Sequence, residues 1–495
     1  MSNVNQRERT TQNRVVQFFQ DKLGYRYLGN WHARADNKNI ERDILAQWLK
    51  SRDVSAPLIA RAISTLEKAA ALGSGIKLYD ANKEVYRLLR YGIKEKEGSG
   101  EHTQTVWLID WDNFAANDFA IAEEVSIKGE HKKRPDVVLY INGIALGVLE
   151  LKRSTISVSE GIRQNLDNQS KDFIRNFFTT MQLVMAGNDS QGLRYGTIET
   201  PERYYLEWKE ASPQPTSTTQ QASQEAHDEL LDRHLYQLCN KQRLLDVIHN
   251  FIVYDMGVKK TCRHNQFFGV QAAKDYLAER KNGIIWHTQG SGKSLTMVWL
   301  AKWIRENIKN SRVLVITDRK ELDEQIEGVF SGIDENIYRT KNGADLIRQL
   351  NHPNPALLCS LVHKFGRHTN DNKDDDSVAN TDEFIEDLKS SLSSNFSAKG
   401  DIYVFVDECH RTQSGKLHSA MTTLLPHATF IGFTGTPLLK KDQKKSIEVF
   451  GPYIHTYKFD EAVADGVVLD LRYEARDIDQ QLLSPDKIDK WFDAK

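Results

Sequence analysis

Apolar positions in residues 1–110 recur with the spacing of an amphipathic helix. Two sets show it: Val15, Val16, Phe18, Phe19 and Leu23, and then Ile40, Ile44, Leu45, Trp48 and Leu49. Steps of three and four residues place such side chains on one helical face, whereas a half-buried strand would alternate apolar and polar residues. We therefore expect this part of the chain to be mainly helical.

From Asp118 onward the apolar residues gather in short runs. Two of these runs, 137–141 and 144–151, are separated only by Asn142-Gly143. An Asn-Gly pair between two apolar runs is the strongest short-range signal for a β-hairpin. The sequence thus predicts a hairpin here, with further helices and strands to about residue 210.

Residues 211–226 contain no large apolar side chain, which indicates a polar loop or linker. The apolar residues that follow favour helices: Leu230, Leu231, Leu235, Leu238, Leu244, Leu245, Ile248 and Ile252. Short apolar runs then alternate with helical stretches, at 284–286, 313–316, 402–406 and 430–433. This alternation predicts an α/β unit whose parallel sheet is covered on both faces. Residues 366–382 are expected to form an exposed insertion.

Composition narrows the class of protein. The 495 residues suggest about three domains at ~150 residues each. With 40% hydrophobic and 27% charged residues the chain is ordinary for a globular protein, and no apolar run approaches the ~18 residues of a membrane span. The N-terminus lacks the apolar core of a signal peptide, and the four cysteines show no CxxC spacing. We expect a cytoplasmic protein with no membrane partner, no zinc site and no disulfide framework.

The net charge of −2 does not exclude nucleic acid as a partner, because a basic groove can be offset by acidic surface elsewhere.

A phosphate site is predicted at His287–Ser294, between an apolar strand and a helical stretch. Gly290, Ser291 and Gly292 would let backbone N–H groups turn towards phosphates at a helix N-terminus. Lys293 would reach the β- and γ-phosphates, and the Ser294 hydroxyl would hold magnesium. His287 stands where the general pattern has glycine, a departure that favours a motor over a small GTPase.

Asp407 and Glu408 end the predicted strand 402–406. Asp407 can orient the water shell of the magnesium ion, and Glu408 can polarise the attacking water. A second group of polar residues, Thr434–Pro437, closes the next strand, where its hydroxyls could sense the nucleotide.

A carboxylate–lysine set lies on the predicted hairpin. Glu150 and Lys152 are two residues apart on one strand, so they project from the same face, and Asp136 enters at the open end. Two carboxylates on magnesium and a lysine beside the attacking water are what phosphodiester hydrolysis requires. A strict two-residue turn would oppose Asp136 to Leu149, on the wrong face, so we predict a bulge that shifts the pairing by one.

Other residues could complete this set. Gln164 is a candidate downstream, and Glu8, Glu123 or Glu124 could supply another acid upstream. For each of these, surface charge or polarity on a helix is the more ordinary interpretation.

The phosphate-site motifs are similar to those of superfamily 2 helicases and translocases. Gly290–Ser294, Asp407–His410 and Gly432–Pro437 resemble motifs I, II and III of that family. Thr317–Gln325 looks like its DNA-contacting motif Ia, and Gln266 resembles the glutamine that reads adenine.

The hairpin segment, residues 134–153, resembles the nuclease core of the motor subunit (HsdR) of type I restriction enzymes, as does the order of nuclease before motor. The resemblance implies a PD-(D/E)xK nuclease with a mixed sheet, followed by a RecA-like parallel-sheet lobe. It implies ATP and magnesium as cofactors, with Asp136, Glu150, Ser294 and Asp407 as metal ligands. It also implies double-stranded DNA as substrate, and partner methyltransferase and specificity subunits that use S-adenosylmethionine.

The resemblance divides the chain into five segments. These are 1–210 (nuclease with N-terminal helices), 211–226 (linker), 227–260 (connecting helices), 261–460 (first RecA-like lobe) and 461–495 (start of a connection to a second lobe).

A superfamily 2 motor needs two lobes, and Arg472 and Arg476 are not convincing as the arginine that a second lobe supplies. We therefore expect a fragment that binds nucleotide weakly and does not turn over ATP. Two alternatives stay open: a DNA-remodelling ATPase whose nuclease fold only binds DNA, and a scaffold that binds ATP without turnover.

Overall fold

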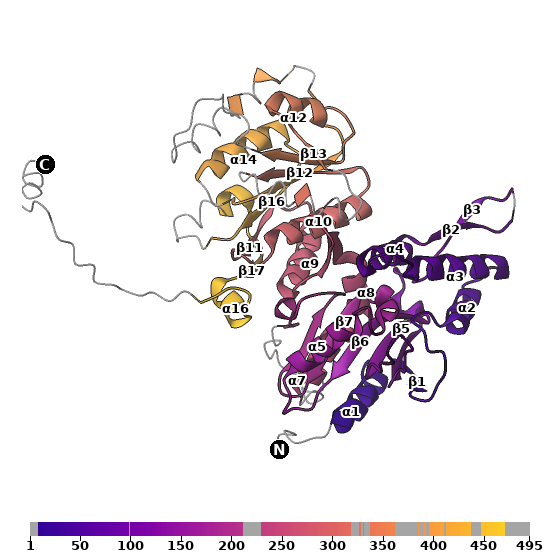
Figure 1. Ribbon diagram of the computed structural model, residues 1–495. Helices are drawn as coiled ribbons and strands as arrows, with labels where there is room; N and C mark the ends of the chain where they lie inside the picture. The colour runs from indigo at the N-terminus through magenta and orange to yellow at the C-terminus, as the bar shows by residue number, and fades with distance from the viewer. Residues whose placement is uncertain are drawn as a thin grey trace, which may run out of the picture.

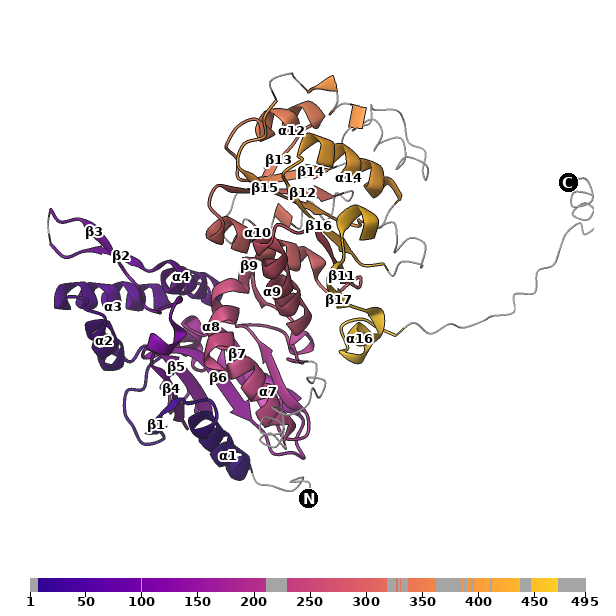
Figure 2. The same cartoon turned by 180° about the vertical axis from the view of Figure 1, so that it is seen from behind.

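The computed structural model describes residues 8–98, 100–210, 229–317, 326–327, 330, 337–361, 385–386, 388, 390–392, 396–409, 412–436 and 447–470, without the side chains of Glu8 and residues 412–417. Figures 1 and 2 show the two large β-sheets with helices packed around them, one built from the N-terminal part of the chain and one from the C-terminal part. The predicted linker at 211–226 and the predicted insertion at 366–382 lie outside the described residues.

Four helices confirm the predicted helical character of the N-terminal region: α1 (Glu8–Asp21), α2 (Arg42–Ser51), α3 (Ala56–Ala70) and α4 (Leu78–Tyr91). The helical expectation is wrong for three strands, β1 (Arg26–Asn30), β2 (Ile93–Lys96) and β3 (Thr103–Val106). β1 is the edge of a sheet and none of its residues is buried, and β3 buries only Val106. Strands that bury so little carry no apolar alternation that the sequence could reveal.

The N-terminal sheet has the strand order β1-β4-β5-β6-β7-β8. Its other strands are β4 (Phe119–Glu123), β5 (Val137–Ile141), β6 (Ile144–Leu151), β7 (Leu183–Asn188) and β8 (Gly192–Gly196). β1 runs parallel to β4 and β6 parallel to β7, whereas the remaining pairs are antiparallel. The predicted hairpin is present as β5–β6, and the mixed sheet agrees with the predicted fold class.

Helices cover both faces of this sheet. α5 (Val158–Asn168) packs on β6 and β7, and α7 (Leu230–Cys239) packs on β8. Short 3-10 turns, η1 (Phe114–Ala116), η2 (Arg175–Thr179) and η3 (Glu202–Tyr204), connect the elements. Every residue of β4, β5, β6 and β7 is buried, which explains why these strands appear in the sequence as apolar runs.

A helix and a hairpin lead from the first sheet to the second. α8 (Lys241–Asn250) is helical as expected, but Ile252 begins the strand β9 (Ile252–Asp255), which pairs with β10 (Val258–Thr261). The helical expectation for Ile252 is therefore wrong. The reason is tertiary, because Lys259 of this hairpin is fully buried and donates to the Asn82 and Gln182 side chains of the N-terminal region.

The C-terminal sheet has the order β13-β14-β12-β15-β16-β11-β17, and all its pairs are parallel, as predicted. Its strands are β11 (Gly283–His287), β12 (Ser311–Thr317), β13 (Tyr338–Arg339), β14 (Leu357–Leu361), β15 (Asp401–Val406), β16 (Thr429–Thr434) and β17 (Tyr453–Tyr457). Its helices include α9 (His264–Ala278), α10 (Lys293–Asn307), α12 (Gly343–Leu350), α14 (Thr412–Leu424) and α16 (Phe459–Ala464).

The two sheets share one cluster of buried apolar side chains. The cluster runs from Val15 of α1 through Leu245 of α8 and Trp299 of α10 to Phe433 of β16. An ion pair between Arg90 of α4 and Glu306 of α10 adds a polar link between the same parts. None of the described helices has both the length and the apolar character needed to cross a membrane.

Candidate functional site

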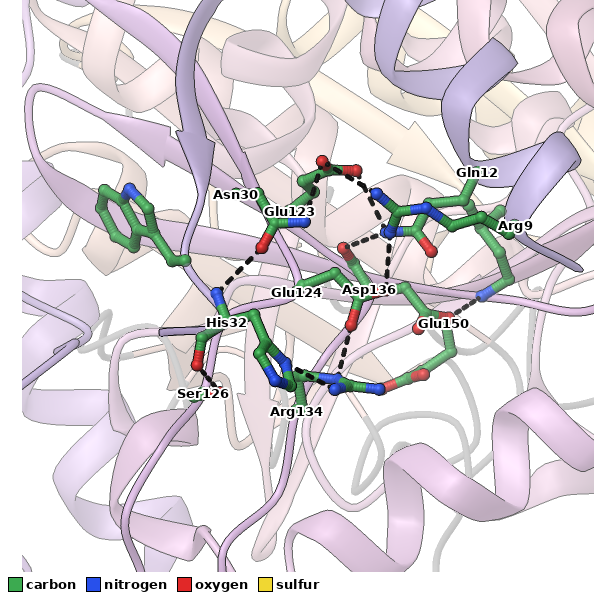
Figure 3. A network of polar contacts seen from close by, with 12 residues as sticks. Arg9, Gln12, Asn30, His32, Glu123, Glu124, Ser126, Arg134, Asp136 and Glu150 are labelled. Atoms are coloured by element: carbon green, nitrogen blue, oxygen red, sulfur yellow. Dashed lines mark hydrogen bonds and ion pairs between the residues drawn. The ribbon is translucent and has the colours of Figure 1, made fainter. Parts of the chain in front are cut away.

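The β5–β6 hairpin contains the predicted bulge. Ile141 pairs with Ile144 and Tyr140 with Ala145, but Leu139 pairs with Gly147, so Leu146 is the extra residue. Beyond the bulge Val137 opposes Leu149, and the next positions outward are Asp136 and Glu150. Residues opposed across an antiparallel pair project from the same face. The prediction of a one-residue shift is confirmed, and Figure 3 shows the two carboxylates near each other.

Hydrogen bonds hold both carboxylates in place. Asp136 Oδ2 accepts from the backbone N–H of Leu151 at 2.7 Å. Glu150 is fully buried, and its Oε2 accepts from Gln164 Nε2 at 2.7 Å while its Oε1 lies 3.4 Å from Asn168 Nδ2. A buried carboxylate is stabilised only where donors such as these replace water.

Helix α5 brings these donors to Glu150. Gln164 and Asn168 are four residues apart, so they share the helix face that looks onto the sheet. Gly161 allows the close approach, because a Cβ there would lie 3.1 Å from Ala186 Cβ and 3.6 Å from Glu150 Cβ. From sequence, Gln164 is a candidate and Asn168, four residues later, is not, so only the structure shows that both contact Glu150.

Lys152 faces the same space as Asp136. Both line a hollow of about 720 Å³ together with Gln164, and Lys152 Nζ donates to the carbonyl of Leu151 at 3.1 Å. The structure thus brings Asp136, Glu150 and Lys152 together at the open end of one hairpin.

Glu123 and Glu124 follow one another at the end of β4, next to the hairpin. The buried carboxylate of Glu123 accepts from Gln12 Nε2 (3.2 Å), Tyr27 Oη (2.9 Å) and Asn30 Nδ2 (3.1 Å). Burial, and then this hydrogen bond, raise the pKa of Tyr27 to about 12, so its phenol remains a donor. Glu123 therefore ties α1 and β1 to β4, whereas Glu124 faces the hollow; the side chain of Glu8 lies outside the described residues.

The donor set at the hairpin suits magnesium. Mg²⁺ is typically held by one or two carboxylates and completes its shell with water and phosphate oxygens. Asp136 and Glu150 are such a pair. Over the part of the chain that the structure describes, no group of three or more His, Cys, Asp and Glu side chains is placed to hold a metal ion.

The predicted phosphate loop leads from β11 into α10. Gly290 and Gly292 have φ angles of +82° and +90°, a left-handed conformation that glycine adopts without strain. Ser291 Oγ donates to the carbonyl of Thr288 at 2.6 Å and closes the turn. Lys293 and Ser294 then begin α10, at the helix end that favours anions.

Gln266 of α9 lies against this loop. Its Nε2 donates to the carbonyl of Gly292 at 2.9 Å, and its Oε1 accepts from the backbone N–H of Arg263 at 2.8 Å. Both ends of the amide are engaged within the protein, so the structure shows Gln266 as a support of the loop. Contact with adenine stays a prediction.

The carboxyl ends of three neighbouring strands meet at this loop. Asp407 and Glu408 follow β15, Thr434 ends β16, and the loop itself follows β11, in the sheet order β15-β16-β11. Ligands of open parallel sheets bind at such carboxyl edges. Gly435 closely approaches the loop, since a Cβ there would lie 2.5 Å from Lys293 Nζ. Residues 318–325, His410, Pro437, Arg472 and Arg476 lie outside the described residues.

His287, the departure from the usual loop pattern, is fully buried. Its Nε2 lies 2.9 Å from His455 Nδ1 of β17, and its ring occupies the space beside Gly269 of α9. Burial lowers the pKa of His287 well below its usual value and that of His455 to about 4. The neutral pair therefore joins β11 to β17, a packing role that the sequence did not reveal.

Two protein families match successive parts of the chain. Residues 5–203 match the type I restriction enzyme R protein N terminus family, and residues 265–495 match the SWI2/SNF2 ATPase family. The first match contains Asp136, Glu150 and Lys152, and the second contains the phosphate loop.

Curated relatives match both parts together. The chain is 28% identical over 440 residues to the putative type I restriction enzyme MjaIXP endonuclease subunit of Methanocaldococcus jannaschii (83% of this chain, 40% of the relative). It is 28% identical over 459 residues to the type I restriction enzyme HindI endonuclease subunit of Haemophilus influenzae (86% and 41%). The chain thus spans about two fifths of these relatives.

Among solved structures, the nuclease-deletion mutant of the Type ISP restriction-modification enzyme LlaGI with a DNA substrate mimic is 14% identical at a TM-score of 0.31, covering 42% of this chain and 21% of that one. A likeness at this score does not define a shared fold. The order of the two family matches and the curated relatives support an HsdR-like subunit, in which a region similar to the type I restriction enzyme R protein N terminus precedes a region similar to SWI2/SNF2 ATPases.

Proposed function

We propose that the protein acts within the restriction and translocation subunit of a type I restriction enzyme. In that role it couples ATP-dependent translocation of double-stranded DNA to magnesium-dependent endonucleolytic cleavage. The observation that carries the proposal is the Leu146 bulge, which sets Asp136 opposite the buried Glu150, beside a hollow that Asp136 and Lys152 line. A hairpin whose charged side chains only contacted solvent would not require a bulge that brings Asp136 opposite Glu150.

At the nuclease site, Asp136 and Glu150 would hold magnesium, which when bound neutralises phosphate charge and makes a water molecule more acidic. The bond from Leu151 N–H fixes Asp136, and Gln164 fixes Glu150, so both carboxylates are oriented before substrate arrives. Lys152 would place its ammonium against the phosphate and stabilise the charge that develops during hydrolysis.

At the ATPase site, the N–H groups of Gly290–Ser294 and the Lys293 ammonium would bind the phosphates of ATP. Ser294 and Asp407 would hold the accompanying magnesium, and Glu408 would polarise the water that attacks the γ-phosphate. Gln266 supports this site by fixing the carbonyl of Gly292.

The curated relatives are longer than this chain, so translocation and the partners are proposals for the whole subunit. We propose methyltransferase and specificity subunits, which use S-adenosylmethionine, as the partners, and the cytoplasm as the place of action.

The test uses the assembled complex, with magnesium, ATP and unmethylated duplex DNA. Glu150→Ala and Lys152→Ala should each abolish cleavage while ATP hydrolysis persists, and Lys293→Ala should abolish both. Arg153→Ala is the matched control, because Arg153 adjoins Lys152 and is exposed to solvent. Unchanged cutting by Glu150→Ala would refute the nuclease assignment and leave a DNA-remodelling ATPase as the function.

A further inference from the structure

The hollow at the hairpin carries far more positive charge than the chain as a whole. Five cationic side chains line it, namely Arg9, Lys132, Lys133, Arg134 and Lys152, against two carboxylates, Glu124 and Asp136. The net charge of the lining is thus 5 − 2 = +3 in a chain whose total is −2. Such a local excess favours a polyanion.

Two of these cations converge on a single carboxylate. Arg9 Nη1 lies 2.9 Å from Glu124 Oε1, and Arg134 Nε lies 2.5 Å from Glu124 Oε2. Figure 3 shows the two guanidinium groups reaching this carboxylate from different segments of the chain. About half of each arginine side chain is exposed, at 50% and 46%, whereas Glu124 is only 12% exposed. Arg9 Nη2 also lies 3.4 Å from Glu123 Oε1, and Arg134 Nη1 lies 2.6 Å from His32 Nδ1. Each guanidinium group carries five N–H donors, so both arginines still offer donors to the solvent side of the hollow.

The backbone at Glu124 is held in an unusual conformation. Its φ angle is +54°, in the left-handed region, and its N–H donates to the carbonyl of Asp136 at 2.8 Å. Non-glycine residues persist in this region only where the surroundings impose it, and they cluster at functional sites. Here the conformation turns the Glu124 carboxylate towards the same hollow as Asp136.

Two guanidinium groups on one carboxylate also form a binding site for phosphate, because the planar fork of arginine matches both anions. We propose that Arg9 and Arg134 form a phosphate clamp for the DNA strand to be cut, and that Glu124 holds the clamp in shape until a backbone phosphate replaces it. The inference rests on the proposed nuclease function and names the residues that position its substrate. Arg134 lies two residues before Asp136, so the clamped phosphate would lie close to the cleaved bond.

DNA binding by the full chain tests the clamp, with an Asp136→Asn background to prevent cleavage. Fluorescence anisotropy of a labelled duplex is followed between 50 and 200 mM KCl. Arg9→Ala and Arg134→Ala should each weaken binding and lower the slope of log K against log salt by about one, the value for one lost phosphate contact. Glu124→Gln should tighten binding several-fold, because the competing carboxylate is gone.

Control variants separate binding from folding. Arg87→Ala removes an exposed arginine that pairs with Glu84 on α4, away from the hollow, and should change neither affinity nor slope. Arg9→Lys and Arg134→Lys keep the charge, so they should retain the slope while losing part of the affinity. In the cleaving protein, Arg9→Ala should raise KM with little change in kcat.

Affinities and slopes for the arginine variants equal to those of Arg87→Ala would overturn the clamp, as would weaker binding by Glu124→Gln. If those results accompany normal cleavage by the parent complex, the clamp fails and the nuclease function stands. If the slopes change as expected but the parent complex never cuts, the nuclease function fails and the two arginines remain a DNA contact.

Discussion

Replacing Glu306 by glutamine should destabilise the protein more than replacing its partner, Arg90, by methionine. Arg90 of α4 is 2% exposed, and its Nε and Nη1 atoms have no hydrogen-bond acceptor among the described residues. Its charge therefore depends on Glu306 of α10, with a further contribution from the Tyr91 ring, 5.5 Å away. Glu306 is 26% exposed and can turn to water if Arg90 is lost.

The magnitudes follow from this asymmetry. Leaving a buried charge without its partner costs roughly 3–5 kcal/mol, and because water reaches Glu306 we expect the lower end, about 3 kcal/mol, for Glu306→Gln. Arg90→Met removes the buried charge itself and should cost about 1 kcal/mol, and the double variant should resemble it. The coupling energy of the pair is then about 3 kcal/mol.

Urea unfolding followed by tryptophan fluorescence measures these differences, because Trp299 is buried in α10 itself. The exposed pair Glu84–Arg87 on α4 provides the control, and Glu84→Gln should cost at most about 0.5 kcal/mol. A Glu306→Gln variant as stable as Glu84→Gln would refute the reasoning, since it would mean that the Arg90 charge is already solvated.

Two further predictions concern pH and the nuclease site. His455 has a folded-state pKa of about 4, below the ~6.5 of an unfolded chain, so only the unfolded chain takes up its proton between these values. The contribution of His455 to the free energy of unfolding is present above pH 6.5 and is lost as the pH falls towards 4, by up to about 1.4 kcal/mol per pH unit. His455→Gln should therefore flatten the pH dependence of the urea midpoint. An unchanged pH dependence would contradict a buried, neutral His287–His455 pair. At Glu150, Gln164→Ala should lower cleavage by roughly 10–100-fold through loss of a charge-assisted bond of about 1.5–3 kcal/mol. Asn168→Ala, at 3.4 Å, should lower it less, and equal effects would contradict the assigned geometry.

The strands that bury both faces could be predicted from sequence, because short uninterrupted apolar runs are typical of strands buried on both faces of a sheet. The bulge could also be predicted, because the Asn142-Gly143 turn fixed one end of the hairpin and the chemistry of Asp136 and Glu150 fixed the other. The β1 strand and the β9–β10 hairpin could not be, since their places depend on partners distant in the chain.

Most residues that orient the site side chains could not be predicted from sequence either, because their contacts also depend on segments distant in the chain. Asn168 contacts Glu150 only because α5 folds back over β6, and Gln266 reaches Gly292 across 26 residues of sequence. His287 looked like a departure from a motif, and only the neighbouring Gly269 and His455 show why a histidine fits there.

The cluster of buried apolar side chains that the two large sheets share limits where this chain can be truncated. α7 packs on β8, Tyr25 Oη donates to the carbonyl of Cys239, and Tyr195 Oη donates to that of Cys262. A polypeptide ended at residue 210 would leave these phenols and the apolar face of β8 open to water. The smallest piece that keeps the N-terminal sheet covered therefore extends past Cys262, into the segment that leads to the C-terminal sheet.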